Sequence, residues 1–347
     1  MNILSKEICA PAGTLRVWGR LRNDEDEAIR RRRGLKRVDR ELEKGNFKAA
    51  LSLAKQLQGK PGGLRGFGAV KLVPKRISVV DELELNDADK MSLHSSVDSI
   101  LRLVKCCRQF ASEEKVGAFL GQDSLTNGDC CGSLSDDRVM CLQHEAGHFV
   151  VGYLLGILPK KYRVPSMEEL EKDNLAGGKV EFLGFEFLQE VSNTTLPETY
   201  FTNRKHNSKE YDGIVSSKTL NRFLCVILGG LAAELLMFGY SELLHSDVDQ
   251  LDRVMKCLGY STDMANSQIK WAAINTLLIL RRHHKATSRV AEAMALGRSI
   301  GFCIDAIETD FGTTNGGRHF GSQANTQAKS PFLTKESIKM NKVLTNL

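Results

Sequence analysis

The feature that most constrains this chain is an HExxH motif at residues 144–148, set in the apolar stretch 139–158. In a helix, residues four positions apart lie one turn above each other, so His144 and His148 project from one face and can reach one metal ion. Glu145 is rotated by about 100° from His144, which suits a carboxylate that takes a proton from a metal-activated water. The motif therefore predicts a zinc-peptidase centre.

The residues around the motif favour a helix. Ser135, Asp136 and Asp137 offer an N-cap and an acidic first turn, apolar residues follow, and Pro159 closes the segment. The alternative is an accidental match in a core helix, but a buried glutamate without a partner is costly, so the pattern favours a site. Catalytic zinc typically has three protein ligands and one water, so a third ligand must come from elsewhere in the chain.

Composition limits the class of protein. With 42% hydrophobic and 26% charged residues, the 347-residue chain is typical of globular proteins. The nine cysteines include no CxxC pair, which argues against a disulfide framework or a zinc knuckle. The apolar run 223–238 is interrupted by Gly229, Gly230 and Glu234 and is too short to span a bilayer, so we expect no transmembrane segment.

Residues 1–78 are expected to form a basic, helical and partly disordered N-terminal region. Residues 1–80 contain 19 Lys/Arg and 8 Asp/Glu. The basic cluster at 30–37 could bind nucleic acid or an anionic surface. The acidic residues 24–27 can pair with this cluster along a helix, and no aromatic residues are interleaved, so a solvated face without a nucleic-acid partner is favoured. Residues 38–57 predict a helical hairpin that turns at Gly45, and no phosphate-binding loop motif occurs.

Residues 79–134 are expected to form a helical linker region. Val97, Ile100, Leu101 and Val104 form one stripe of an amphipathic helix, and a loop follows at 121–134.

Further along the chain, the alternation in 179–188 predicts one or two strands around Gly184, and an edge strand there would bind extended peptide. An ordinary small sheet is the alternative. A groove open to the metal beside this segment would favour a peptidase, whereas a plugged groove would oppose one.

The C-terminal half predicts mostly helices. A long apolar helix spans 217–238 with Gly239 as its stop, and Ser246 suits the N-cap of the next helix, which Gly259 ends. The helical pattern continues from 263 to about 308. The tail 311–347 has too few apolar residues to fold alone, so it is expected to be disordered.

Three segments carry a resemblance to a known family. HEAGH at 144–148, GGLAAELLMFG at 229–239 and SDVDQL at 246–251 resemble, in order and spacing, the peptidase domain of the FtsH family of zinc metallopeptidases, peptidase family M41. The match covers about 135–260, with weaker agreement to about 308. The fold that this implies is mainly α, with a helical zinc-peptidase domain at 135–310 that carries a small β element.

The resemblance implies the roles of individual residues. It gives His144, His148 and Asp247 as zinc ligands and Glu145 as the general base, and Glu234 matches the first glutamate of the family's pair. Spacing alone does not choose Asp247 over its neighbours Asp249, Glu242 and His245.

The chain also departs from the family. FtsH proteases carry an AAA+ ATPase module upstream, but this chain has no Walker A loop before residue 135, and Leu231 and Leu235 replace a family arginine and glutamate. The chain is therefore similar to ATPase-less FtsH-like proteins of plants, which implies a chloroplast location in place of the default cytoplasmic one.

Two functions are consistent with these observations. The first is a zinc metallopeptidase that hydrolyses unfolded protein or peptide substrates without its own ATPase. The second is a catalytically silent, zinc-binding regulator that binds FtsH-type AAA+ protease complexes or assembles as a homo-oligomer. An intact Glu145 beside intact ligands favours chemistry, whereas the missing ATPase favours regulation.

Overall fold

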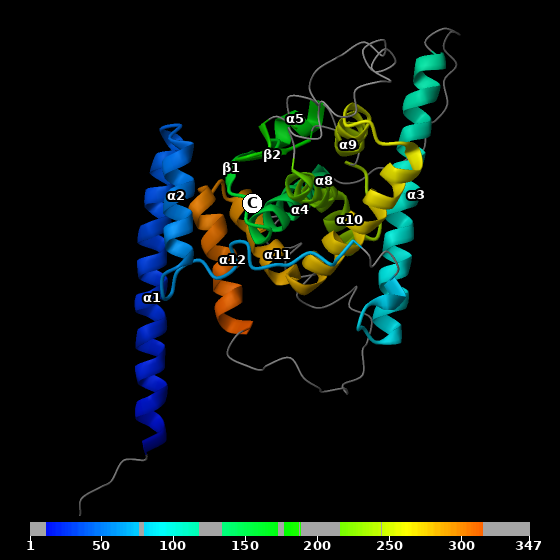
Figure 1. Cartoon of the computed structure of the whole chain (residues 1–347). Coiled ribbons are helices and arrows are strands. Elements are labelled where there is room, and N and C mark those ends of the chain that lie inside the picture. The colour runs from blue at the N-terminus through cyan, green and yellow to red at the C-terminus, as the bar shows by residue number, and fades with distance from the viewer. Residues whose placement is uncertain are drawn as a thin grey trace, which may run out of the picture. The chain divides into compact units, whose positions relative to one another are not determined.

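The computed structural model describes residues 12–75, 80–117, 134–172, 177–186, 188, 216–243 and 245–314. These residues are mainly helical, which confirms the predicted class (Figure 1). The chain divides into two compact units, Met1–Arg65 and Gly66–Leu347.

The first unit is a helical hairpin. Helix α1 (Ala12–Glu43) is followed by α2 (Phe47–Gln58), and Gly45 turns the chain between them with a φ of +75°. This left-handed conformation suits glycine, because a side chain at that φ is strained. The hairpin predicted over 38–57 is confirmed, and its first helix extends well towards the N-terminus.

Two helices form the centre of the second unit: α4 (Leu134–Leu154) carries the HExxH motif, and α8 (Ser217–Phe238) packs along it (Figure 1). The two backbones approach each other at glycines, since a Cβ on Gly147 would lie 2.3 Å from the carbonyl oxygen of Gly229. Gly239 caps α8 in the left-handed conformation, as predicted. The most apolar 18-residue window of α8 would suit a membrane span by composition, but 72% of it is buried within the structure.

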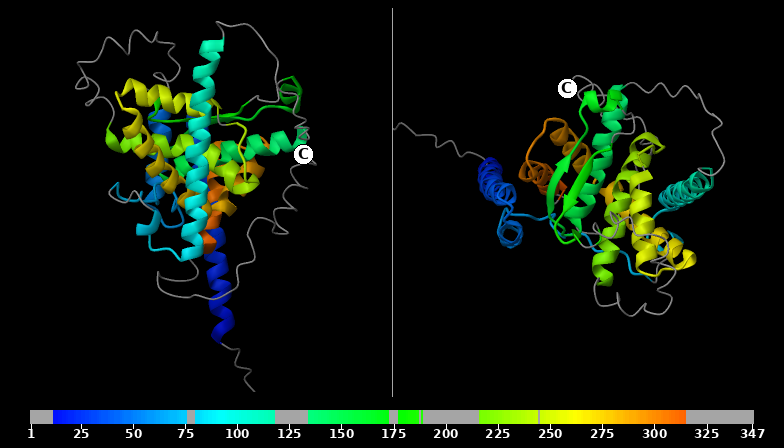
Figure 2. Two further views of the ribbon diagram at one scale, coloured as in Figure 1. Left: turned by 90° about the vertical axis from the view of Figure 1, so that its right-hand side faces the viewer. Right: turned by 90° about the horizontal axis from the view of Figure 1, so that it is seen from above.

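The other helices surround this pair. They are η1 (Val80–Glu82), α3 (Asp87–Gly117), α9 (His245–Cys257), α10 (Thr262–Arg282), α11 (His284–Ala295) and α12 (Ile300–Thr314). Seen from above, α4, α8, α10 and α3 follow one another across the unit (Figure 2). On α3 the predicted stripe faces inward: Val97, Ile100 and Val104 are buried, and Leu101 is half-buried.

The small β element is a two-stranded antiparallel sheet of β1 (Pro159–Arg163) and β2 (Lys179–Phe182), with α5 (Met167–Lys172) between the strands. The strand predicted at the start of 179–188 is therefore confirmed, but a second strand after Gly184 is wrong. Gly184 turns the chain with a φ of +92°, and residues 186 and 188 are helical. The partner strand lies instead at Pro159, where a helix stop was expected.

Two helix boundaries also differ from prediction. Ser246 is not an N-cap, because α9 already begins at His245. The expected disordered tail from residue 311 starts inside α12, which continues to Thr314. The loop prediction for 121–133 and the tail beyond 314 lie outside the described residues.

Residues 66–75, which we call the strap, are the first part of the second unit, and hydrogen bonds attach them to its helices. The amide of Gly66 donates to the carboxylate of Glu308 at 2.8 Å, and the amide of Gly68 donates to the carbonyl of Tyr153 at 3.1 Å. The indole of Trp271 donates to the carbonyl of Val73 at 2.9 Å. The strap therefore belongs to the unit that carries the HExxH helix.

Candidate metal centre

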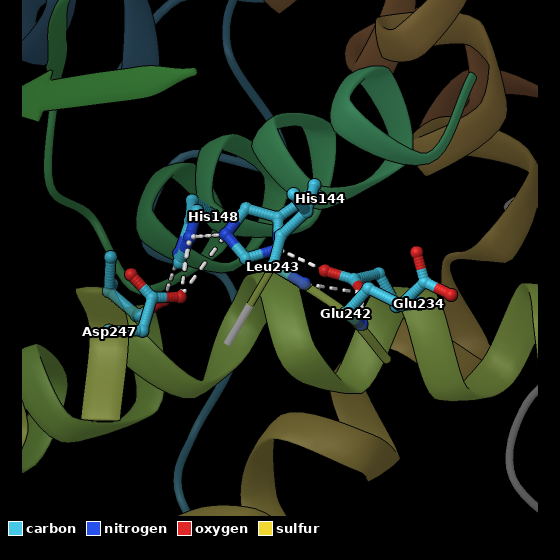
Figure 3. Close-up of polar contacts among 7 residues, drawn as sticks. His144, His148, Glu234, Glu242, Leu243 and Asp247 are labelled. Carbon is cyan, nitrogen blue, oxygen red and sulfur yellow. Dashed lines mark hydrogen bonds and ion pairs between the residues drawn. The ribbon is translucent and has the colours of Figure 1, made fainter. Parts of the chain in front are cut away.

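Three side chains from two helices meet at one point. Nε2 of His144 and Nε2 of His148, both on α4, lie 2.9 Å apart, and each lies 3.2 Å from Oδ2 of Asp247 on α9 (Figure 3). Bonds of about 2.0–2.2 Å to a tetrahedral zinc ion would place ligand atoms roughly 3.3 Å apart. His144, His148 and Asp247 thus form a largely buried group with the spacing needed to hold a metal ion.

The hydrogen-bond partners of the histidines fix which ring nitrogens face the group. Nδ1 of His148 contacts the carbonyl oxygen of Val226 at 2.6 Å, and because a carbonyl only accepts, Nδ1 carries the proton. Nδ1 of His144 likewise contacts the carboxylate of Glu234. In the neutral rings, both Nε2 atoms therefore direct lone pairs towards Asp247, whose buried Oδ2 accepts no hydrogen bond. Three converging acceptors require a cation or added protons.

Glu234 also organises the chain between α8 and α9. One carboxylate oxygen contacts His144, and the other accepts hydrogen bonds from the backbone amides of Glu242 at 2.9 Å and Leu243 at 3.4 Å (Figure 3). This fully buried carboxylate therefore connects a histidine of α4 to the segment that leads to Asp247.

Glu145 lies beside the group but outside it. Its side chain is 2% exposed, and its Oε2 has no hydrogen-bond partner among the described residues. The nearest backbone includes Gly178, where an added Cβ would lie 2.7 Å from Oε1 of Glu145. A buried carboxylate with an unused oxygen has the capacity to accept a proton.

The local charges shift the pKa values of these groups. Burial lowers the pKa of His144, but Asp247, Glu234 and Glu145 together raise it well above the ordinary value. The pKa of His148 is raised for similar reasons, although burial opposes the shift. Burial raises the pKa of Glu145. For Asp247, burial is outweighed by the two histidines, which hold its pKa well below the usual range.

Arg108 of α3 ties α9 to its neighbours. Its Nη2 lies 2.6 Å from Oδ1 of Asp252 on α9, and its Nη1 donates to the side-chain oxygen of Asn266 on α10 at 2.8 Å. Asp252 follows Asp247 on the same helix, so Arg108 holds the helix that carries Asp247, the one carboxylate of the group.

The predicted site residues fall into two sets: those that come together at the group and those that lie outside it. His144, His148 and Asp247 come together with Glu145 beside them, whereas the rivals Asp249, Glu242 and His245 are exposed and stand outside the metal-binding group. The sequence reasoning missed the carbonyl of Val226, which carries no side-chain signal. It also did not predict the close approach of two glycines to the site. Gly178 lies against Glu145, and a Cβ on Gly230 would lie 2.4 Å from the His144 ring.

The described residues leave little access to the group. His144 is 4% exposed and His148 7%, and the side chain of Asp247 is 15% exposed. The three side chains are therefore largely enclosed, and the groove expected beside 179–188 stays a prediction, because segments on both sides of β2 lie outside the described residues. Residues 189–215, which follow this region, lie outside the description.

Comparisons with known proteins add no relative: no protein-family model, no curated protein and no solved structure matches the chain.

Proposed function

We propose that this protein is a zinc metallopeptidase that hydrolyses unfolded protein or peptide substrates without an ATPase module of its own. His144, His148 and Asp247 would hold the zinc ion, whose neutral-nitrogen and carboxylate ligand set is typical of catalytic zinc sites. When bound, zinc supplies a Lewis acid that polarises a carbonyl and lowers the pKa of water.

Each residue has a distinct role in this proposal. Glu145 accepts a proton from the attacking water and then donates it to the departing amine, a task for which its raised pKa is suitable. Glu234 orients His144, and the carbonyl of Val226 orients His148, so both imidazoles keep the tautomer that binds metal.

One observation carries the proposal: the lone pairs of His144, His148 and Asp247 converge, and a buried carboxylate with an unused oxygen stands next to them. An accidental HExxH in a core helix would not require Asp247 to come from another helix and meet both imidazoles. A purely structural site would not require Glu145.

The test compares the wild type with Glu145→Gln, which keeps the size of the side chain but removes the base. We expect one zinc per chain in both proteins, and cleavage of unfolded casein that falls by about 10²–10⁴-fold in the variant. Glu168→Gln, at an exposed glutamate of α5, is the matched control and should cleave as the wild type does. Absence of zinc in the wild type would refute the proposal.

A second candidate is favoured by the burial of the site. Glu145 is 2% exposed and Gly178 lies against its side chain, so very little of the carboxylate that would act as the base reaches solvent. This observation suits a zinc-binding regulator of FtsH-type AAA+ proteases that performs no hydrolysis. Zinc without casein cleavage, together with equal effects of wild type and Glu145→Gln on the turnover of such a protease, would establish the regulator.

A further inference from the structure

The first unit carries a row of positive charge that neither candidate function of the metal centre uses. Residues 1–65 contain 16 Lys/Arg and 8 Asp/Glu, a net charge of +8, whereas the whole chain has a net charge of only +6. Five exposed basic residues lie along α1, and we call them the basic stripe: Arg30, Arg33, Lys36, Arg37 and Arg40. The positive charge of the chain is therefore concentrated in the helical hairpin.

Helical spacing places the stripe on one face of α1. At about 100° per residue, its four arginines lie within about 80° of one another around the helix, and its lysine borders them. The roughly opposite face carries Leu35, Val38 and Leu42, which are buried in the hairpin that α1 forms with α2 (Figure 1). The packing of the hairpin therefore turns the stripe towards solvent.

The acidic residues next to the stripe in sequence do not neutralise it through the described contacts. Glu27 pairs with Arg65 at 3.1 Å, and Arg30 donates to the backbone carbonyl of Asp26 rather than to its carboxylate. Among the side chains that the structure describes, no carboxylate forms an ion pair with a member of the stripe. The pairing that favoured a merely solvated face is thus not seen there.

The guanidinium groups of the stripe keep donors for a ligand. Nε of Arg40 donates to the carbonyl of Lys36 at 3.3 Å, which leaves both Nη atoms without an acidic partner among the described residues. The neighbouring Glu41 is occupied by Lys44 at 3.1 Å and by the amide of Asn46 at 2.9 Å. The stripe therefore presents several forked donors that can bind an anion.

These features select phosphate groups arranged in a row. Arginine binds phosphate through two parallel N–H donors. From Arg30 to Arg40 the stripe is about 15 Å long at 1.5 Å per residue, which is comparable with the roughly 12 Å width of the major groove of a duplex. A nucleic-acid duplex offers rows of phosphates on that scale, and contacts to its backbone do not depend on base sequence.

A membrane surface and a single strand fit the stripe less well. A helix that lies in a bilayer surface buries its apolar face there, but the apolar face of α1 is already buried in the hairpin. Proteins bind single strands by stacking the bases on aromatic side chains, and residues 26–44 contain no aromatic residue. A duplex keeps its bases paired inside and requires no stacking platform.

We propose that the basic stripe of α1 binds the phosphate backbone of a double-stranded nucleic acid without reading its base sequence. Arg33 and Arg37 lie at the centre of the stripe, one turn apart, so their loss interrupts the row. The proposal does not depend on the metal centre, because the stripe belongs to the first unit and the metal-binding group to the second.

The experiment measures binding to the full chain by fluorescence anisotropy at several salt concentrations. The probes are labelled duplexes of about two helical turns, one of DNA and one of RNA. The proteins are the wild type, Arg33→Gln/Arg37→Gln, the charge-preserving Arg33→Lys/Arg37→Lys, and Lys48→Gln/Lys55→Gln, which removes the same charge from exposed positions of α2. Circular dichroism checks that every variant folds.

We expect the wild type to bind both duplexes, with a plot of log affinity against log salt that has a slope of about −3 to −5. Arg33→Gln/Arg37→Gln should bind at least about tenfold more weakly at low salt, and the magnitude of its slope should fall by about 2. Lys48→Gln/Lys55→Gln should change the affinity by less than about threefold. The lysine variant should retain most of the affinity, and the duplex that binds more tightly identifies DNA or RNA as the ligand.

Three results would overturn the proposal. The first is that neither duplex binds even at low salt. The second is that both glutamine variants weaken binding equally, which would show a general effect of net charge. The third is that Arg33→Gln/Arg37→Gln binds the duplexes as the wild type does but loses binding to vesicles that contain anionic lipid, which would assign the stripe to a membrane surface.

Discussion

The two helices that supply the metal-binding atoms are held in different ways. Helix α4 packs against α8 with direct backbone contact at Gly147 and Gly229, and both of its histidines are buried. Helix α9 is amphipathic: one face is exposed, the other buries Val248, Leu251, Val254 and Met255, and polar contacts through Glu234 and Arg108 add to this packing. The histidine pair is part of the core, whereas the carboxylate of Asp247 is brought to it from another helix.

This difference predicts which substitutions affect folding and which affect metal binding. Changes in the α4–α8 contact should act on folding first and on metal binding as a consequence. Changes in the polar groups of α9 or in their contacts should act on metal binding and leave the fold intact.

The largest expected effect on folding comes from Gly147→Ala. The new Cβ would lie 2.3 Å from the carbonyl oxygen of Gly229, so α4 and α8 must separate. We expect the free energy of unfolding to fall by about 1–3 kcal/mol in urea titrations of the metal-free protein. Gly177→Ala, where nothing lies within 4 Å, is the control and should have little effect. Equal stability of both variants would contradict the close contact.

Asp247→Asn should produce the opposite pattern. The amide keeps the size of the side chain but loses the charge, so zinc affinity should fall by more than about 100-fold, while the metal-free unfolding midpoint at alkaline pH, where both imidazoles are neutral, changes little. Asp249→Asn, an exposed neighbour on α9, should bind zinc as the wild type does. A loss of affinity in Asp249→Asn instead would mean that the wrong carboxylate has been assigned.

Glu234→Gln tests the connection between the two regions. Glutamine cannot accept from both His144 and the amides of Glu242 and Leu243 as a carboxylate does. We expect a loss of about 10–100-fold in zinc affinity, measured by competition with a chelator. Glu242→Gln removes an exposed carboxylate and should leave the affinity unchanged, and an equal loss there would point to a general charge effect.

Lower pH should weaken metal binding through the histidines of α4 alone. Their pKa values are raised above the ordinary 6.5, so metal must displace protons already above that pH, whereas Asp247 stays ionised. Zinc affinity should therefore fall by about tenfold or more between pH 7.5 and 6.5, as measured by calorimetry with proton release. An affinity that is flat over this range would show that the histidines bind no protons in the metal-free protein.

The smallest effect is expected for Arg108→Gln, which loosens α9 without touching the group. Its pair with Asp252 is partly exposed, and such pairs contribute about 1 kcal/mol or less, so zinc affinity should fall by about two- to fivefold. Arg102→Gln, at an exposed position of α3, is the matched control. An effect as large as that of Asp247→Asn would mean that α9 depends on α3 for its fold.

The same contrast explains how much of the site could be predicted from sequence. His144, Glu145 and His148 follow from helical spacing, because four residues make about one turn. Asp247 could not be separated from Asp249 or Glu242 by spacing, since its selection depends on where Glu234 holds the preceding amides.

The fold was predictable to a similar degree. Long apolar helices such as α8 have strong periodic signals, and their positions were predicted correctly. Strand β1 was missed because its charged residues Lys160, Lys161 and Arg163 conceal a strand whose partner lies 16 or more residues away. The turn at Gly184 ended β2 early, because a φ of +92° reverses the chain before Phe185 can continue the alternation.

The strap also determines which residues must stay together with the metal-binding unit when the chain is cut or fused. A segment cut at residue 135 would contain the whole metal-binding group, yet it would remove the Gly66 amide from the buried carboxylate of Glu308 and the Val73 carbonyl from Trp271. A fusion that keeps these hydrogen bonds of the metal-binding unit should therefore join the chain before residue 66. The chain segment that a working unit needs therefore begins well before its HExxH helix.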